Sequence, residues 1–208
     1  MARYLSIHPD DPQPRLLAQA AEVVRSGGVL AIPTDSCYAL GCHLGDKEAM
    51  DRIRLIRQMD ERHHLTLMVR DLSEIAHFAR VDNAQYRLLK ATTPGSYTFI
   101  LEGTKELPRR VLHPKRKTIG LRVPSHPVAL ALLEELNEPL LTTTLQLPGD
   151  EEPLTEGWEI QDRLEDQIEL ILDAGHCGIE PTTIIDLTAS TPELIRAGRG
   201  SLAPFGLD

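Results

Sequence analysis

The sequence is poor in aromatic residues, with three Phe, four Tyr and one Trp among 208 residues. Proteins that hold single-stranded RNA usually stack its bases on aromatic side chains, so this scarcity disfavours such a platform. Recognition of double-stranded RNA through its backbone needs fewer aromatic residues and stays open. Long apolar runs are lacking too. Since a membrane span needs ~20 apolar residues, we expect no contact with a membrane.

Cysteine is also rare. Cys37, Cys42 and Cys177 fit neither a disulfide framework nor a zinc-ligand pattern, so we expect reduced thiols in a cytoplasmic protein. The segment 1–5 has no long apolar run followed by small residues, and we therefore expect no signal peptide. No Gly-x-x-x-x-Gly-Lys motif is present, which excludes a P-loop nucleotide site.

Charge is distributed unevenly along the chain. The net charge is −9, and residues 150–169, with nine acids and one base, account for −8 of it. Six bases fall within 14 residues, namely Arg109, Arg110, Lys115, Arg116, Lys117 and Arg122. A basic strip on an acidic protein favours a local site for an anion, such as nucleotide phosphate or the RNA backbone. A solvated face that binds nothing would show the same pattern.

Hydrophobic periodicity predicts helices and strands in alternation from end to end. Helices are expected at 14–26, from a cap at Asp46, and at 73–79, 83–90, 127–136 and 159–167. Strands are expected at 29–32, 65–69, 97–101, 118–123, 140–144, 169–172, 183–187 and 193–196. This alternation is typical of an α/β fold with helices covering a twisted sheet. Because no linker-like stretch interrupts it, we expect one domain.

Polar residues follow the first predicted buried strand directly. Ligands collect at the carboxyl ends of strands in α/β sheets, and Thr34, Asp35 and Ser36 offer two hydroxyls and a carboxylate there. A purely structural turn uses the same residue types, so site and turn are equally good interpretations.

Two arginines occupy strand positions. Arg122 lies within an apolar strand, where an unpaired charge is costly to bury, so it should meet a carboxylate or an anionic ligand. Arg196 has a similar setting, and the planar fork of arginine suits phosphate and carboxylate. Together they predict a shared anion pocket. The threonines at 142–144 and 182–183 are common in strands for packing reasons alone.

Six segments, taken in order, resemble the YrdC-type family of threonylcarbamoyl-adenylate synthases. They are Pro33-Thr34-Asp35-Ser36 with Tyr38 and Gly41, Thr93-Pro94-Gly95 with Thr98, Thr118 to Pro124, Pro139 to Thr144, Pro181 to Asp186, and Ile195 to Gly198. The resemblance covers about residues 14–200. Tyr38 to Cys42, Lys115 to Gly120 and Leu145 to Gly149 are similar to the YciO branch of that family.

The resemblance implies a single domain over residues 1–208, without the additional C-terminal domain of longer members. Its fold would be YrdC/RibB-like, a twisted mixed α/β sheet bent around a deep, positively lined cavity. It also implies a reaction in which bicarbonate carboxylates the amino group of L-threonine. The product then attacks the α-phosphate of ATP, giving threonylcarbamoyl-AMP for tRNA modification, and pyrophosphate. Mg²⁺ would accompany ATP, and no permanent cofactor is expected.

The same resemblance assigns roles to individual residues. Thr34 and Arg122 would bind threonine, whereas the nucleotide would contact Arg57, His63, Thr144, Gln146, Thr182 and Arg196. The strip of Arg109, Arg110, Lys115, Arg116 and Lys117 would face tRNA, double-stranded RNA or another anion. No residue is expected to ligate a metal. The pair His63-His64, with Glu61 nearby, reads as a solvated loop.

The chain departs from the synthase pattern at two places. Synthases carry Lys-x-Arg after the second helix, with a lysine several residues on, where this chain has Arg57, Met59 and His63. Their Ser-x-Asn is replaced by Thr144 and Gln146. A charge-assisted hydrogen bond contributes ~1.5–3 kcal/mol, so one lost cation predicts a roughly ten- to a hundred-fold loss in triphosphate affinity or rate.

Three hypotheses follow from these departures. The first is a slow threonylcarbamoyl-AMP synthase. The second is a non-catalytic protein that binds double-stranded RNA or associates with the ribosome. The third is a related enzyme that transfers a carbamoyl or nucleotidyl group to another substrate.

Overall fold

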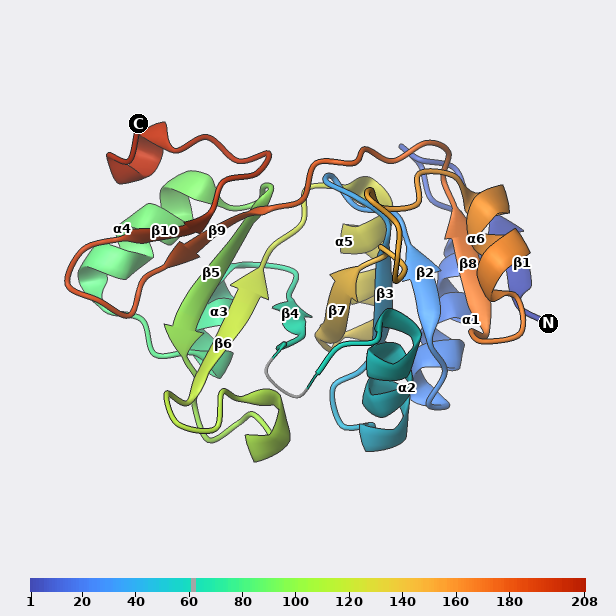
Figure 1. The fold of residues 1–208 in the computed structure, drawn as a ribbon, viewed down its shortest axis with the longest axis horizontal. Coiled ribbons are helices and arrows are strands. Elements are labelled where there is room, and N and C mark those ends of the chain that lie inside the picture. Colours follow the sequence, from blue (N-terminus) through green and yellow to red (C-terminus); the bar gives the residue numbers. More distant parts are fainter. Residues whose placement is uncertain (61–62) are drawn as a thin grey trace.

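The fold is described from a computed structural model, which covers residues 1–60 and 63–208; Glu61, named above, lies outside the described residues. The strands are β1 Arg3–Ser6, β2 Leu30–Ile32, β3 Ala39–His43, β4 Thr66–Met68, β5 Tyr97–Glu102, β6 Thr118–Arg122, β7 Leu140–Thr144, β8 Leu170–Asp173, β9 Thr183–Asp186 and β10 Glu193–Arg196. Within the described residues they form one ten-stranded sheet in the order β1-β8-β2-β3-β7-β4-β6-β5-β9-β10 (Figure 1). Parallel and antiparallel pairs are mixed, which confirms the predicted mixed α/β sheet.

The helices begin and end where local chemistry favours it. They are α1 Pro14–Arg25, α2 Lys47–Arg57, α3 Leu72–Phe78, α4 Asn83–Thr92, α5 Pro127–Leu136 and α6 Gly157–Leu164, with short 3₁₀ turns η1 Arg109–Val111 and η2 Ala203–Phe205. Proline occupies the first turn of α1 and of α5, where its missing N–H is not needed. The carboxylate of Asp46 accepts a hydrogen bond from Ala49 N at 2.9 Å and caps α2, as predicted.

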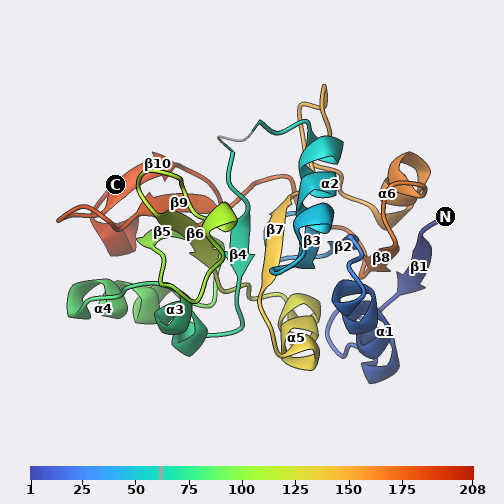
Figure 2. The same cartoon turned by 90° about the horizontal axis from the view of Figure 1, so that it is seen from below.

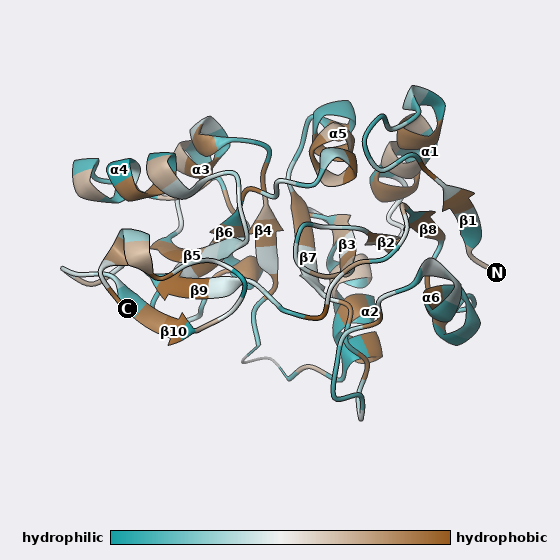
Figure 3. Cartoon of the chain, turned by 90° about the horizontal axis from the view of Figure 1, so that it is seen from above, coloured by the Kyte–Doolittle hydropathy of each residue, from teal (hydrophilic) through white to brown (hydrophobic). Residues whose placement is uncertain are grey.

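Two apolar cores pack against the sheet. One core joins α1 and α5 to the strands beneath them, whereas the other joins α2 and α6 to the sheet and extends through the β5–β9 region to α3 and α4. Figure 2 shows α1, α3, α4 and α5 on one side of the sheet and α2 and α6 on the other. The hydropathy colouring in Figure 3 places brown segments at the strands and teal on the outward faces of the helices. Burying these apolar faces contributes roughly 25 cal/mol per Å².

The structure corrects three sequence-based predictions. The strand β3 was not predicted, because Ala39 to Cys42 are all buried and carry no alternating pattern. The short edge strand β1 was also missed; it pairs in parallel with β8 through only four residues. The helix α6 begins and ends earlier than the predicted 159–167.

The structure describes the state of the three cysteines and the character of the helices. Cys37, Cys42 and Cys177 are all free and buried, consistent with the expected reduced thiols. Among the helices in the described part of the chain, none has the length and apolar character needed to cross a membrane.

Candidate functional site

A cavity of about 270 Å³ lies along neighbouring strands from β3 to β10 in the order of the sheet. It is lined by all eight residues that the sequence singled out for threonine or nucleotide, Thr34, Arg57, His63, Arg122, Thr144, Gln146, Thr182 and Arg196. Among the described residues that line it, none carries a carboxylate, whereas three are arginines and two are histidines. The lining is therefore cationic and rich in hydroxyl groups, which suits an anionic guest. The binding roles of these residues remain predictions.

The loop between β2 and β3 is both a turn and part of the cavity wall. The hydroxyl of Thr34 accepts hydrogen bonds from the backbone N–H groups of Ser36 and Cys37, each at 3.2 Å, and donates to Cys37 O at 2.5 Å. These bonds close the turn, as in other Ser/Thr turns. The side chain of Thr34 is buried yet lines the cavity, so the predicted turn is confirmed and the predicted binding role stays a prediction.

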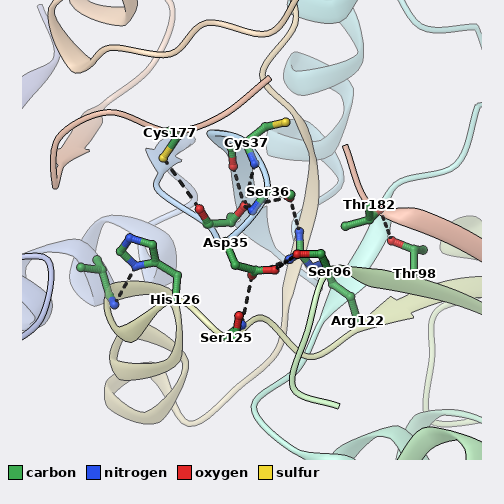
Figure 4. A network of polar contacts seen from close by, with 12 residues as sticks. Asp35, Ser36, Cys37, Ser96, Thr98, Arg122, Ser125, His126, Cys177 and Thr182 are labelled. Atoms are coloured by element: carbon green, nitrogen blue, oxygen red, sulfur yellow. Dashed lines mark hydrogen bonds and ion pairs between the residues drawn. The ribbon is translucent and has the colours of Figure 1, made fainter. Parts of the chain in front are cut away.

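Arg122 and Asp35 form a buried ion pair beside this loop. Nη2 of Arg122 donates to Oδ1 of Asp35 at 2.7 Å, and Nη1 donates to the hydroxyl of Ser36 at 3.1 Å (Figure 4). The side chains are 7% and 10% exposed. The Nε atom of Arg122 is buried and has no hydrogen-bond partner among the described residues. Arg122 is thus held by Asp35 and Ser36, and its Nε–H is not used by them.

Asp35 connects three segments that lie far apart in the sequence. Its carboxylate also accepts hydrogen bonds from the hydroxyl of Ser96 at 2.5 Å and from the backbone N–H of Ser125 at 3.0 Å. Burial alone would raise the pKa of Asp35, but the charge of Arg122 and the hydrogen bonds from Ser96 and Ser125 lower it below its ordinary value. Asp35 therefore stays ionised and fixes the direction of the guanidinium group.

The C-terminal end of α2 brings a second guanidinium group to the cavity. Nη1 of Arg57 donates to the backbone carbonyl of Gln146, while its Nε is buried and unpartnered among the described residues. Burial lowers the pKa of Arg57, and no carboxylate of the described chain pairs with it. The side chain of Gln146 is turned to the carbonyl of Asp150 at 3.0 Å. Arg57 therefore offers a largely uncompensated positive charge.

Met59 and His63 occupy the neighbouring wall. The hydroxyl of Thr143 lies 3.9 Å from Sδ of Met59, which packs on the apolar core. The ring of His63 is exposed and pairs with Asp60 at 2.9 Å. The structure thus places an apolar side chain, where synthases carry a cation, directly on the cavity wall.

The third guanidinium group comes from the edge strand β10. Nε and Nη2 of Arg196 donate to the carbonyl of Thr182 at 3.2 and 2.8 Å, and the hydroxyl of Thr182 lies 2.8 Å from that of Thr98. Gly198 allows this close approach, because a Cβ atom there would lie 2.3 Å from the carbonyl oxygen of Pro181. Arg196 has no ion-pair partner among the described residues, so it too offers a free charge.

His64 lies in a different setting from the one that the sequence predicted. His64 was expected in a solvated loop together with His63, but it is half-buried and belongs to the cavity wall. Neither of its ring nitrogens has a hydrogen-bond partner among the described residues. Its place directly before the buried Leu65 was the available signal.

The basic strip is divided by the fold. Arg122, counted in the strip from its sequence position, lies in the cavity because β6 carries it into the sheet. Arg116 pairs with Asp186 at 2.7 Å, and Arg110 donates to the carbonyl of Gly45 at 2.7 Å. Exposed members remain near the β5–β6 loop, namely Arg109, Lys115 and Lys117. The strip is therefore a surface feature outside the cavity.

No cluster of three or more His, Cys, Asp or Glu side chains able to hold a metal ion occurs among residues 1–60 and 63–208. The donor set of the cavity, arginine, threonine and histidine without carboxylate, is likewise not one that Mg²⁺ prefers.

Comparison with known proteins places this geometry in a family. The Sua5/YciO/YrdC family model, described as telomere recombination, matches residues 22–198. The chain belongs to this family. An uncharacterized protein named YciO from Escherichia coli K12 is 57% identical over 99% of this chain and all of its own length, and the crystal structure of E. coli YciO superposes with a TM-score of 0.95. The predicted closeness to YciO within the Sua5/YciO/YrdC family is thus confirmed.

More distant members of the family have named activities or ligands. The threonylcarbamoyl-AMP synthase of Vibrio vulnificus is 30% identical over 88% of this chain and 98% of its own length. The crystal structure of P. abyssi Sua5 complexed with L-threonine is 25% identical, with a TM-score of 0.86, and covers 94% of this chain. This chain spans 57% of that Sua5 chain.

Proposed function

We propose that this protein is a nucleotidyltransferase of the threonylcarbamoyl-AMP synthase type. In the proposed reaction bicarbonate carboxylates the amino group of L-threonine, and the resulting carbamate attacks the α-phosphate of ATP and expels pyrophosphate. The observation that carries the proposal is the convergence of Arg57, Arg122 and Arg196, from three distant segments, on one cavity in which none of the described lining residues carries a carboxylate. The relatives named for this synthase activity support it.

Each part of the cavity would hold one part of the reactants. Arg122, fixed by Asp35 and retaining a free Nε, and the neighbouring Thr34 suit the carboxylate and hydroxyl of threonine. Arg57 and Arg196, which lack carboxylate partners in the described chain, suit the phosphates. Since none of the described residues that line the cavity carries a carboxylate for Mg²⁺, the ion would arrive bound to the phosphates of ATP. Such transfer depends mainly on positioning and on stabilising developing charge.

Threonine-dependent release of pyrophosphate tests the proposal. We expect purified protein with ATP, Mg²⁺ and bicarbonate to release pyrophosphate faster when L-threonine is added, and threonylcarbamoyl-AMP to appear in equal amount by mass spectrometry. Arg196→Ala removes a free cation from the cavity and should lower this rate at least tenfold, since a hydrogen bond to a charged group contributes ~1.5–3 kcal/mol. Equal rates with and without threonine would exclude the synthase reaction.

A second candidate function is binding of RNA phosphates by the exposed part of the basic strip. The observation that favours it is that Arg109 and Lys115 are exposed and make no side-chain hydrogen bond or ion pair within the described residues. A double-stranded RNA or tRNA backbone would neutralise such charges and release counterions.

Charge reversal tests this second candidate without disturbing the fold. Arg109→Glu with Lys115→Glu should weaken RNA binding and reduce the dependence of log affinity on log salt by roughly one unit for each lost phosphate contact. Arg15→Glu with Arg87→Glu makes the same change in net charge on two exposed helix positions and serves as the control. If both double variants bind RNA equally well in fluorescence anisotropy, the strip is a solvated face.

A further inference from the structure

His64 lies where two hollows meet. It lines the main cavity and also a smaller hollow of about 250 Å³, which extends between β4, β5, β6 and β9 towards the β5–β6 loop. Thr66, Thr98 and Ile184 line both hollows as well. Both ring nitrogens of His64 are buried and lack a partner within the described part of the chain. An imidazole left in this way has its full capacity to bond to a guest in the cavity.

A second histidine lies behind the first. The ring centroids of His64 and His113 are 5.2 Å apart, with the planes tilted by 52°. Nδ1 of His113 accepts the backbone N–H groups of Arg116 at 3.0 Å and of Lys115 at 3.3 Å, so the ring proton of neutral His113 resides on Nε2. His113 is partly exposed. The two rings therefore connect the cavity with the surface.

Arginine and histidine side chains surround His64 on the sides that the structure describes. Arg54 faces it from α2, His63 from its own loop, and His113 and Arg116 from the β5–β6 loop. None of the described residues that line the two hollows carries a carboxylate. Burial, and then the neighbours His113, Arg54 and His63, lower the pKa of His64 below 6.5. The ring is therefore uncharged at pH 7 and free to accept a proton.

We propose that His64 is the general base that deprotonates the amino group of the acceptor in the cavity. This inference rests on the proposed function, in which an amine must lose a proton before it attacks carbon. Of the titratable side chains that line the cavity, Cys37 has a pKa raised by burial to about 11, and His63 is already paired with Asp60. His64 combines a place on the wall with two ring nitrogens that have no hydrogen-bond partner among residues 1–60 and 63–208.

The proton balance of the step is simple. The ammonium group of threonine gives one proton to His64, and the freed electron pair on nitrogen forms a bond to the carbon of bicarbonate. The bond from that carbon to its hydroxyl group breaks, and the hydroxide leaves as water with a second proton from nitrogen. The carbamate oxygen then attacks the α-phosphorus of ATP, and the bond to pyrophosphate breaks. His64 then gives up its proton to solvent.

The pH profile of the synthase reaction tests this role. In the wild-type protein, kcat for threonine-dependent pyrophosphate release should fall as the pH drops through a value below 6.5, because protonated His64 cannot act as a base. His64→Gln keeps a polar side chain of similar size without a basic nitrogen. It should lower kcat by about 10²-fold or more and remove the fall of kcat at acidic pH, here called the acidic limb of the profile. Added imidazole should restore part of the activity of this variant. His77→Gln, on an exposed helix position, is the matched control and should leave the profile unchanged.

A second variant leaves His64 in place. His113→Gln removes a neighbour that lowers the pKa of His64, so the acidic limb should move to higher pH. If the wild-type protein is active but His64→Gln folds and retains both kcat and the limb, or if His113→Gln leaves the limb unmoved, His64 is not the base. If the wild-type protein shows no threonine-dependent release at any pH, the synthase reaction itself is wrong, and the inference falls with it.

Discussion

Replacing Arg122 by methionine is expected to lower the free energy of unfolding by about 3–5 kcal/mol at pH 7. The substitution keeps the apolar stem of the side chain but removes the charge that faces Asp35 at 2.7 Å. Asp35, 10% exposed, would remain as a buried and uncompensated carboxylate. The loss of stability therefore comes mainly from the partner that stays behind, and binding of L-threonine should be lost with it.

The effect of this substitution should depend on pH in a defined direction. In the wild-type protein the folded-state pKa of Asp35 is lowered, so Asp35 contributes stability above its ordinary pKa of 3.8, and this contribution is lost as the pH falls through the folded-state value. Without Arg122, burial is less opposed and raises the folded-state pKa. In the variant, the free-energy cost of burying the Asp35 carboxylate then disappears as the pH falls and this carboxyl group is protonated. The two proteins should therefore differ most near pH 7 and converge towards pH 3.8 and below.

Urea unfolding at several pH values measures this difference, and a double variant provides the control. Asp35→Asn added to Arg122→Met removes the buried charge while an amide oxygen can still accept from Ser125 N. We expect the double variant to be more stable at pH 7 than the single Arg122→Met variant. If the single variant loses less than about 1 kcal/mol at pH 7, or loses the same amount at every pH, the ion pair does not hold this loop as argued here.

Much of the fold was predictable because local signals agreed with tertiary packing. The helix Pro127–Leu136 and the strands Leu140–Thr144 and Glu193–Arg196 have the predicted bounds, since periodicity and the flanking turns coincide there. The strand β3 was missed for a physical reason. It is buried between β2 and β7 and follows a turn rich in hydroxyl groups, so the turn signal in Thr34 to Cys37 masked the strand behind it.

The composition of the cavity was predictable to a similar degree, but its internal contacts were not. An arginine in an apolar strand required a partner, and the sequence left carboxylate and ligand as alternatives. The structure shows the carboxylate, Asp35, and leaves Nε of Arg122 without a partner among the described residues. The sequence could not show that contact, since the two residues are 87 positions apart. Separation in the sequence is also the reason why the contact between the rings of His64 and His113 was not predicted, since that contact depends on the packing of two loops.

Met59→Arg tests how far the lack of a cationic side chain at position 59 limits the binding of ATP in this cavity. Met59 lies on the cavity wall, near Thr143 and two positions from Arg57. A guanidinium group there would face the phosphates expected beside Arg57, and one charge-assisted hydrogen bond contributes ~1.5–3 kcal/mol. We therefore expect the variant to bind ATP, or to turn it over in the presence of threonine, roughly ten- to a hundred-fold better than the wild-type protein.

Two opposing effects set the size of that gain. Removing Met59 sacrifices its packing on the apolar core, and the new charge lies close to Arg57, so the variant should be somewhat less stable in the absence of nucleotide. Met59→Leu keeps an apolar side chain of similar size and should leave ATP affinity unchanged. Calorimetry with ATP, alongside thermal unfolding of both variants, separates the two effects. A folded Met59→Arg variant that binds ATP no better than Met59→Leu would mean that the phosphates do not lie at this end of the cavity, and that Arg57 serves a different group of the guest.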